Sequence, residues 1–236
     1  MSMEDRTQLL LGPDGVERLK NSSVVLVGCG AVGGYVLEGF VRAGVGRIRV
    51  YDHDVFSDSN LNRQILATTE TIGRTKVDVA CERARSINPS IDIEGKDVLV
   101  NEETVPEILS GEFDILVDAI DTVRNKAALL RYAAKNGIMT FSSMGAARHL
   151  DATSIRVAPL KSTKVCPIAA SMRRELREFD TSRIITVYST EQPITTPAGR
   201  DDFGKSVLGS LPTVPAIFGM TLANEAIRYL VRGDDI

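Results

Sequence analysis

The chain has 236 residues, 43% hydrophobic and 25% charged, which is enough to bury one sizeable core in a globular protein. Its net charge of −3 excludes a general electrostatic attraction to nucleic acid, so any RNA contact must come from a local basic patch. The three cysteines lack C-x-x-C spacing and no apolar run approaches about 18 residues, so neither a cysteine-bound zinc site nor a membrane span is predicted.

Strand and helix patterns alternate along the first 145 residues. Hydrophobic patterning predicts strands at 24–27, 47–51, 91–95, 115–117 and 138–142. Amphipathic segments between them predict helices at 31–43, 74–87, 101–109 and 123–136, the last capped by Asp121 and Thr122. In the first helix, Glu38 and Arg42 are expected to pair on the outward face. Because crossover helices pack back on their sheet, the alternation predicts a doubly wound, mostly parallel α/β fold.

Beyond residue 145 the pattern changes. Strands are expected at 154–157 and 184–188, around a charged helix at 167–179, and these strands extend the sheet. The segment 192–207 is rich in proline and glycine and predicts a crossover loop before a final helix at 214–232. We expect a single domain, 1–236, in which residues 1–145 bind a nucleotide and residues 146–236 bind the substrate. A cytoplasmic location is expected, since the chain starts without a signal-peptide pattern.

A glycine loop joins the first strand to the first helix. Gly28, Gly30 and Gly33 form the G-x-G-x-x-G pattern, which brings backbone N–H groups and the positive helix end close to a phosphate. Asp52 ends the second strand, at the spacing where an acidic side chain binds ribose hydroxyls. The alternative is a tight turn without a ligand, with Asp52 capping it. The combined spacing favours a nucleotide site.

Additional charged residues indicate a triphosphate rather than a dinucleotide. Arg63, in the run Ser59–Gln64, and Lys76 would suit the larger charge of three phosphates. Taken singly, each is better explained as a solvated surface cation, and only the two together favour a phosphate site. Asp121 follows the strand 115–117, at the edge where open α/β sheets bind ligands, and is a candidate ligand for Mg²⁺ or a simple helix cap.

These motifs resemble the family of adenylating enzymes of the ThiF and ubiquitin-activating type, which includes bacterial activators of sulfur-carrier proteins. The resemblance covers nearly the whole chain and implies a Rossmann-like fold that binds ATP and Mg²⁺. It assigns Asp52 to ribose and Asp121 to Mg²⁺, and implies a nucleotide-binding set of Gly28, Gly30, Ala31, Gly33, Asp52, Asp54, Asn60, Arg63, Gln64, Lys76 and Asp121. Ala31 departs from the family's usual second glycine. Arg6 resembles the family arginine that reaches the phosphates of a partner subunit, which implies a homodimer.

Within the family, the segments 118–126, 166–177 and 187–193 resemble members that dehydrate threonylcarbamoyladenosine in transfer RNA to a cyclic form. This implies that ATP adenylates the threonine-derived carboxylate, and that a nucleophile of the modified base then displaces AMP. The implied catalytic residues are Arg63, Lys76, Asp121 and Arg6. The alternative is an adenylyltransferase for a ubiquitin-like sulfur-carrier protein, although the two C-x-x-C zinc pairs usual in those members are missing. A nucleotide-binding scaffold and, more distantly, a hydride-transfer enzyme are also open.

The substrate half contains a basic stretch at 161–183, with six basic and three acidic side chains. With the resemblance, this stretch predicts contact with RNA, whereas charged helices in general are solvated faces. The candidate substrate-binding residues in it are Arg173, Arg174, Arg177 and Cys166. Cys166 would either form a thioester or simply pack. His53 and His149 have no partner at catalytic or metal spacing and are assigned no role.

Overall fold

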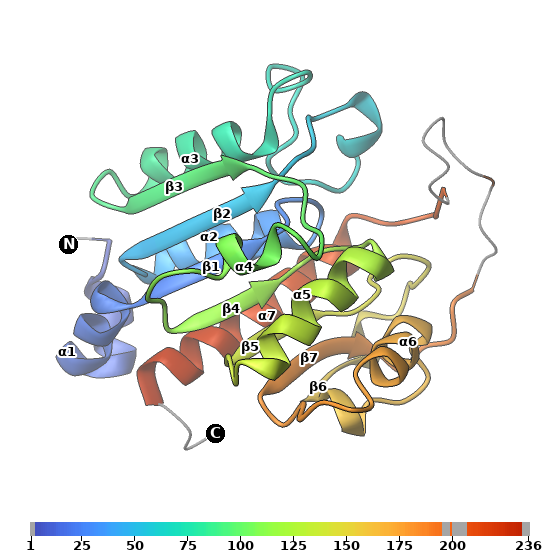
Figure 1. The fold of residues 1–236 in the computed structure, drawn as a ribbon. Helices are drawn as coiled ribbons and strands as arrows, with labels where there is room; N and C mark the ends of the chain where they lie inside the picture. Colours follow the sequence, from blue (N-terminus) through green and yellow to red (C-terminus); the bar gives the residue numbers. More distant parts are fainter. Residues whose placement is uncertain (1–2, 195–198, 200–206, 233–236) are drawn as a thin grey trace.

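A single seven-stranded sheet forms the centre of the computed structural model, which describes residues 3–194, 199 and 207–232 (Figure 1). The spatial order is β3-β2-β1-β4-β5-β7-β6, and all neighbouring pairs are parallel except β6 with β7. The strands are β1 (Ser23–Val27), β2 (Arg47–Asp52), β3 (Asp92–Asp97), β4 (Ile115–Asp118), β5 (Thr140–Ser143), β6 (Ile155–Pro159) and β7 (Ile184–Ser189). The predicted doubly wound, mostly parallel fold, extended by C-terminal strands, is confirmed.

Helices cover both faces of this sheet. One face packs against α2 (Gly33–Ala43), α3 (Lys76–Ile87) and α7 (Thr213–Arg232), with α1 (Asp5–Asn21) lying on α7. The other face carries α4 (Val105–Ile108), α5 (Val123–Lys135) and α6 (Pro167–Glu175). Short 3₁₀ turns occur in the connections at η1 (Asp58–Asn60), η2 (Ala152–Ser154) and η3 (Leu160–Ser162).

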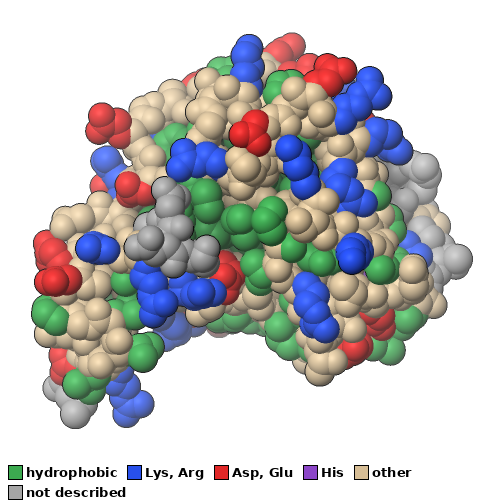
Figure 2. All heavy atoms as spheres, turned by 90° about the horizontal axis from the view of Figure 1, so that it is seen from below, with side chains coloured by type: hydrophobic (Ala, Val, Ile, Leu, Met, Phe, Trp, Pro, Cys, Tyr) green, Lys and Arg blue, Asp and Glu red, His purple; other side chains and the backbone are tan. Residues whose placement is uncertain are grey.

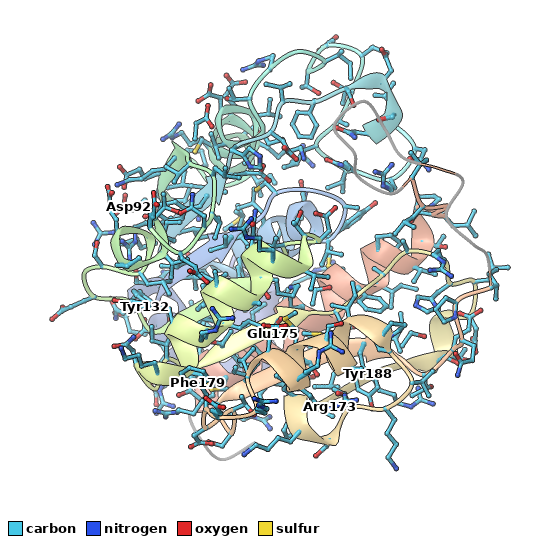
Figure 3. All side chains as sticks on the ribbon, turned by 45° about the vertical axis from the view of Figure 1, so that its right-hand side comes forward. Asp92, Tyr132, Arg173, Glu175, Phe179 and Tyr188 are labelled. Atoms are coloured by element: carbon cyan, nitrogen blue, oxygen red, sulfur yellow. The ribbon has the colours of Figure 1, made fainter. Side chains whose placement is uncertain are left out.

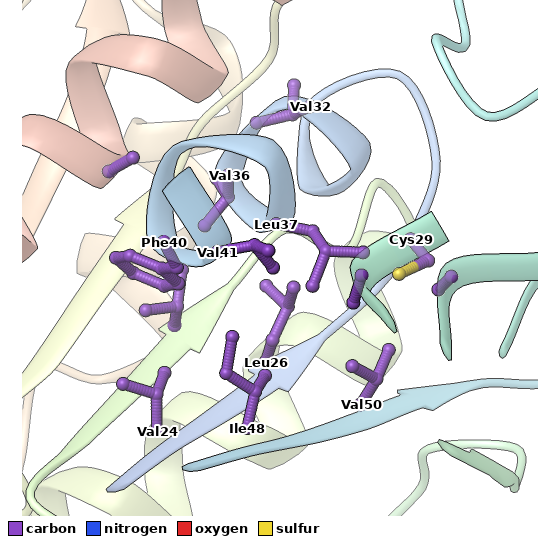
Figure 4. Close-up of a cluster of buried hydrophobic side chains, with 14 of the residues drawn as sticks. Val24, Leu26, Cys29, Val32, Val36, Leu37, Phe40, Val41, Ile48 and Val50 are labelled. Atoms are coloured by element: carbon purple, nitrogen blue, oxygen red, sulfur yellow. The ribbon is translucent and has the colours of Figure 1, made fainter. Parts of the chain in front are cut away.

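The main core lies between α2 and the central strands. Val36 and Phe40 of α2 are fully buried, as their helical spacing predicts, and they pack in one cluster with Leu26 and Ile48 (Figure 4). Glu38 corrects the prediction of an outward pair: it bonds Arg42, but it is buried and also accepts a hydrogen bond from Arg83 of α3. The carboxylate therefore links two helices.

Several boundaries differ from those predicted. The helix α1 was not expected, because Gly12, with φ of 73°, and Pro13 interrupt it. The helix α4 has a single turn, because Asn101 and Thr104 bond each other's backbone just before it. The helix α6 ends at Glu175, four residues early, so residues 176–179 form a turn. Most of the predicted loop 192–207 lies outside the described residues.

The strand order creates a switch point between β1 and β4. From β1 the chain proceeds outward to β2 and β3, and it then returns to start β4 on the other side of β1. Helices therefore diverge at the carboxyl ends of these two strands, where doubly wound folds form their ligand crevice. The loops that follow β1, β2 and β4 meet there. None of the helices in the described ranges is long and apolar enough to cross a membrane.

Candidate functional site at the switch point

The glycine loop after β1 is held close to the end of β4. Gly28 has φ of 95°, and a Cβ there would lie 2.8 Å from the Ala119 carbonyl oxygen. A Cβ on Gly33 would lie 1.8 Å from the Gly28 carbonyl oxygen. Gly30 differs, since the nearest atom to its Cβ position is Gln64 Nε2 at 3.8 Å. The fold itself therefore requires Gly28 and Gly33, whereas Gly30 leaves an open loop surface of the kind that phosphates occupy.

Asp52 joins this loop to the end of β2. Its Oδ2 accepts a hydrogen bond from the Cys29 backbone N–H at 2.6 Å, and its Oδ1 accepts one from the Asp54 N–H at 2.9 Å. The carboxylate is thus fixed beside the loop, as the ribose assignment requires. Burial raises the pKa of the Cys29 thiol well above its ordinary value, and the charge of Asp52 adds to this effect. Cys29 therefore remains an uncharged packing residue.

Lys76 starts α3 and points into the site. Its Nζ donates to Asp54 Oδ2 at 2.7 Å, and its backbone N–H donates to the Asp54 carbonyl at 3.0 Å. Only 5% of the residue is exposed, so Lys76 is not a solvated surface cation. An ammonium group has three N–H donors, which leaves donors beyond the Asp54 pair for a phosphate. His53 lies beside this pair, with Nε2 3.5 Å from Asp54 Oδ1.

The run Ser59–Gln64 forms a compact turn next to the loop. Asn60 caps it, since its Oδ1 accepts from the Ser57 N–H at 3.1 Å. Nη1 of Arg63 donates to the Ser59 carbonyl and to Asn62 Oδ1, both at 2.8 Å. These bonds fix the guanidinium near its own turn. Gln64 is buried and faces Gly30, and its Oε1 has no hydrogen-bond partner among the described residues.

A buried ion pair supports the turn after β4, and sequence reasoning did not single it out. Lys126 Nζ lies 2.5 Å from Asp118 Oδ2 and also donates to the Ser143 carbonyl at 2.9 Å. The Ser142 hydroxyl donates to Asp118 Oδ2 at 2.6 Å, and the Ile120 N–H donates to Oδ1 at 3.0 Å. The eight-residue spacing between Asp118 and Lys126 could have indicated this pair, because it brings a lysine near the start of α5 back to the end of β4.

Asp121 is exposed on this turn, two residues beyond the Ala119 carbonyl that faces Gly28. The predicted position of the helix cap is confirmed, because Thr122 is the N-cap residue of α5, although its side chain makes no capping bond. Asp121 lies at the switch point, where its Oδ1 accepts a hydrogen bond from the Thr122 hydroxyl at 3.3 Å. Ala31 lies in the turn just before α2. The glycine loop, Asp52, Asp54, Lys76, the Arg63 turn and Asp121 thus gather at one edge, and together they fit a nucleotide that carries several phosphates and a hard cation.

The predicted substrate residues lie elsewhere, around α6 (Figure 3). Arg173 donates to the Thr163 hydroxyl, while Arg174 is exposed and Arg177 lies beyond the end of the helix. Cys166 is 3% exposed and packs in the core cluster beneath α6, so the packing interpretation fits it better than a thioester. Seen from below, Lys and Arg side chains lie scattered among acidic, hydrophobic and other side chains on that face of the molecule (Figure 2).

Two further predictions are placed away from the loop. Arg6 is exposed on α1, and the structure does not bring it to the switch point of its own chain. His149, for which no partner at catalytic or metal spacing is expected, has an acidic neighbour to which its Nδ1 makes no hydrogen bond. It is buried, with Nδ1 3.6 Å from Glu191 Oε2. Burial lowers the pKa of His149, and the charge of Glu191 opposes this shift.

Comparison with known proteins agrees with this geometry. A tRNA threonylcarbamoyladenosine dehydratase of Bacillus subtilis is 32% identical over 245 residues, which span 98% of this chain and 95% of that protein. The crystal structure of the Escherichia coli tRNA N6-threonylcarbamoyladenosine dehydratase in complex with ATP superposes with a TM-score of 0.86 at 29% identity, covering 98% of this chain and 97% of the other.

A sulfur carrier protein adenylyltransferase of Thermus thermophilus is 46% identical, but over 111 residues only, which are 47% of this chain and 41% of that protein. Residues 5–235 match the model of the ThiF family. The family predicted from the sequence motifs is confirmed: this chain belongs to the ThiF family.

Proposed function

We propose that this protein uses ATP to dehydrate threonylcarbamoyladenosine in transfer RNA, and that it does so through an acyl-adenylate. The observation that carries the proposal is the linked set at the switch point, in which Asp52, the glycine loop and the Asp54–Lys76 pair are hydrogen-bonded or packed together. The relatives of similar length bear this activity in their names.

Each group has a defined task in this scheme. The loop N–H groups and Asn60 contact phosphates, Asp52 binds the ribose, and Asp121 holds Mg²⁺, which neutralises phosphate charge when bound. Arg63 and Lys76 stabilise the charge that develops at the α-phosphate. A substrate carboxylate oxygen attacks the α-phosphorus, and the bond to pyrophosphate breaks. A nucleophile of the modified base then attacks the acyl carbon, closes the ring and releases AMP.

The main test is Mg²⁺-dependent AMP formation by the purified protein. Threonylcarbamoyl-modified transfer RNA should stimulate it, whereas the same RNA without the modification should not. We expect Arg63→Ala to lower the rate on the order of 10²-fold, by analogy with other charge-stabilising sites. Arg47→Ala is the matched control, since Arg47 pairs with Asp92 at the opposite, amino edge of the sheet. Equal activity of the two variants would refute the role of Arg63.

A homodimer is part of the proposal. Arg6 lies near Leu9 and Leu10 on α1, which are 86% and 83% exposed and offer an apolar surface for a partner to cover. Arg6 would then act on the phosphates of the neighbouring subunit. If so, the Arg6→Ala homodimer and the Arg63→Ala homodimer are each impaired. A mixed dimer of one Arg6→Ala subunit and one Arg63→Ala subunit regains activity, because one of its two sites has both an intact Arg63 and an intact Arg6 from the other subunit. If the two variants exchange subunits after mixing and activity still does not rise, Arg6 does not act on the site of the neighbouring subunit.

The RNA is proposed to bind the half that follows residue 145, over α6. Lys161, Lys164 and Arg174 are exposed there, and each phosphate contact should make binding weaker as salt rises. An RNA affinity that does not change with salt concentration would contradict RNA binding at this surface. A cytoplasmic location fits such a substrate, together with three free buried cysteines.

The second candidate is adenylation of a ubiquitin-like sulfur-carrier protein. The local identity to the Thermus thermophilus enzyme favours it. The switch-point site would perform the same first step on a C-terminal carboxylate. Stimulation of AMP or pyrophosphate release by such a carrier, and not by modified RNA, would make it the leading function.

A further inference from the structure

Arg148 has an unusual backbone conformation at the carboxyl edge of the sheet. Its φ is 69°, in the left-handed region that side chains with a Cβ rarely adopt. Hydrogen bonds to two distant segments hold it there. Its N–H donates to the Gly209 carbonyl at 2.9 Å, and its carbonyl accepts from the Ile194 N–H at 3.1 Å. The loop after β5, the segment after β7 and the segment before α7 therefore fix Arg148 together.

The segment before α7 also contacts the phosphate-side turn. Ser210 follows Gly209, and its carbonyl accepts from Asn62 Nδ2 at 3.1 Å. One peptide unit thus separates the bond to Arg148 from the bond to Asn62, the direct neighbour of Arg63. The segment at Gly209 and Ser210 therefore lies between Arg148, on the side of β5 and β7, and the turn that carries Arg63.

Buried polar atoms in this cluster lack partners. Arg148 Nε and His149 Nδ1 are buried, and neither has a hydrogen-bond partner among the described residues. In folded proteins, the large majority of buried side-chain polar atoms have a hydrogen-bond partner. Glu191 is already engaged, since its Oε2 accepts from the N–H groups of Leu150 and Asp151, both at 3.0 Å. These bonds make Glu191 a positioning residue for the loop, while Arg148 Nε has no acceptor among the described residues.

We propose that Arg148 binds the carboxylate of the incoming substrate and orients it toward the α-phosphate near Arg63. This inference rests on the function proposed above. A guanidinium fork matches a carboxylate through two parallel N–H···O bonds, and a fixed fork keeps the attacking oxygen in line. The same fork also matches an RNA phosphate, so the experiment must separate the two sources of oxyanion.

The test compares Arg148→Gln and Arg148→Lys with Arg156→Gln, a control on the exposed strand β6. Three quantities are measured for each: ATP affinity, affinity for unmodified transfer RNA, and kcat/KM for AMP formation with modified RNA. For Arg148→Gln we expect unchanged ATP and RNA affinities, and a fall in kcat/KM on the order of 10²-fold. Arg148→Lys should recover part of the loss, because it keeps the charge without the fork.

Each other outcome decides against the proposal. Arg148 binds a phosphate if, in Arg148→Gln, the affinity for unmodified RNA falls by the same factor as kcat/KM, and if the slope of log affinity against log salt concentration becomes smaller by about one. If both Arg148 variants match Arg156→Gln, Arg148 has no role in binding. Should Arg148→Gln not fold, Arg148→Lys alone provides the comparison. A wild-type protein that RNA does not stimulate refutes the proposed function itself, whereas an active wild type with equally active variants refutes only the role of Arg148.

Discussion

The buried pair between Lys126 and Asp118 gives a strong prediction for stability. Both side chains are almost completely excluded from solvent, with 1% and 0% exposed. Lys126→Met would leave the Asp118 carboxylate with the Ser142 hydroxyl and the Ile120 N–H as the hydrogen-bond donors to its side chain within the described part of the chain. Breaking a buried pair in this way costs about 3–5 kcal/mol. For a chain of this length, a loss of that size lowers Tm by roughly 10 °C.

Urea unfolding with a constant m-value would measure the loss. The double variant Lys126→Met with Asp118→Asn should recover at least half of it, because the neutral amide no longer needs a cation and its oxygen still accepts hydrogen bonds. Lys96→Met is the control, since Lys96 pairs with Glu94 at the surface and should change stability by less than about 0.5 kcal/mol. A Lys126→Met variant as stable as this control would refute the reasoning.

Three further predictions follow from the site and its surroundings. Gly33→Ala should lower Tm by roughly 10 °C or prevent folding, because the added methyl group would collide with the backbone. Gly30→Ala should keep Tm within about 2 °C but weaken ATP binding at least about tenfold. Equal effects of the two variants in calorimetry would contradict this prediction. The pKa of His149 is lower in the folded protein than in the unfolded chain, so the unfolded chain binds the proton first as pH falls. The free energy of unfolding should therefore decrease as pH drops below about 6.5. His149→Gln should weaken this pH dependence in urea titrations between pH 7 and 5. All three thiols are buried, so Ellman's reagent should label them only after unfolding, and rapid labelling of the native protein would contradict the structure.

The central part of the fold could be predicted because its signals are local. Strand β1 is an apolar run, β2 carries Ile48, Val50 and Tyr51 between polar residues, and α2 has its apolar residues at helical spacing, so the type of each element can be predicted from its own residues. The helix α1 gave no such signal. Only Gly15, Val16 and Leu19 are buried in it, and its position depends on packing against α7 at the far end of the chain.

The candidate site divides in the same way. Asp52 and the glycine loop follow a fixed spacing within one strand–helix–strand unit, which sequence shows directly. The pair of Asp54 and Lys76 requires α3 to return to the end of β2, where Val55 and Thr75 form an isolated bridge. The contacts of Glu191 with Leu150 and Asp151 join loops after different strands. Partners of this kind are set by the strand order, which no local pattern specifies.

The strand order also leaves the sheet with two free edges, where another chain could add a strand. The edge strand β3 has charged residues at four of its six positions, Asp92, Glu94, Lys96 and Asp97, which disfavour such pairing. The other edge strand, β6, exposes Arg156 and ends at Pro159, which has no N–H to donate. Self-association through a continuous intermolecular sheet is therefore disfavoured at both ends. The homodimer proposed above would therefore have to form through helices and loops, and its assembly would be distinct from aggregation through strand edges.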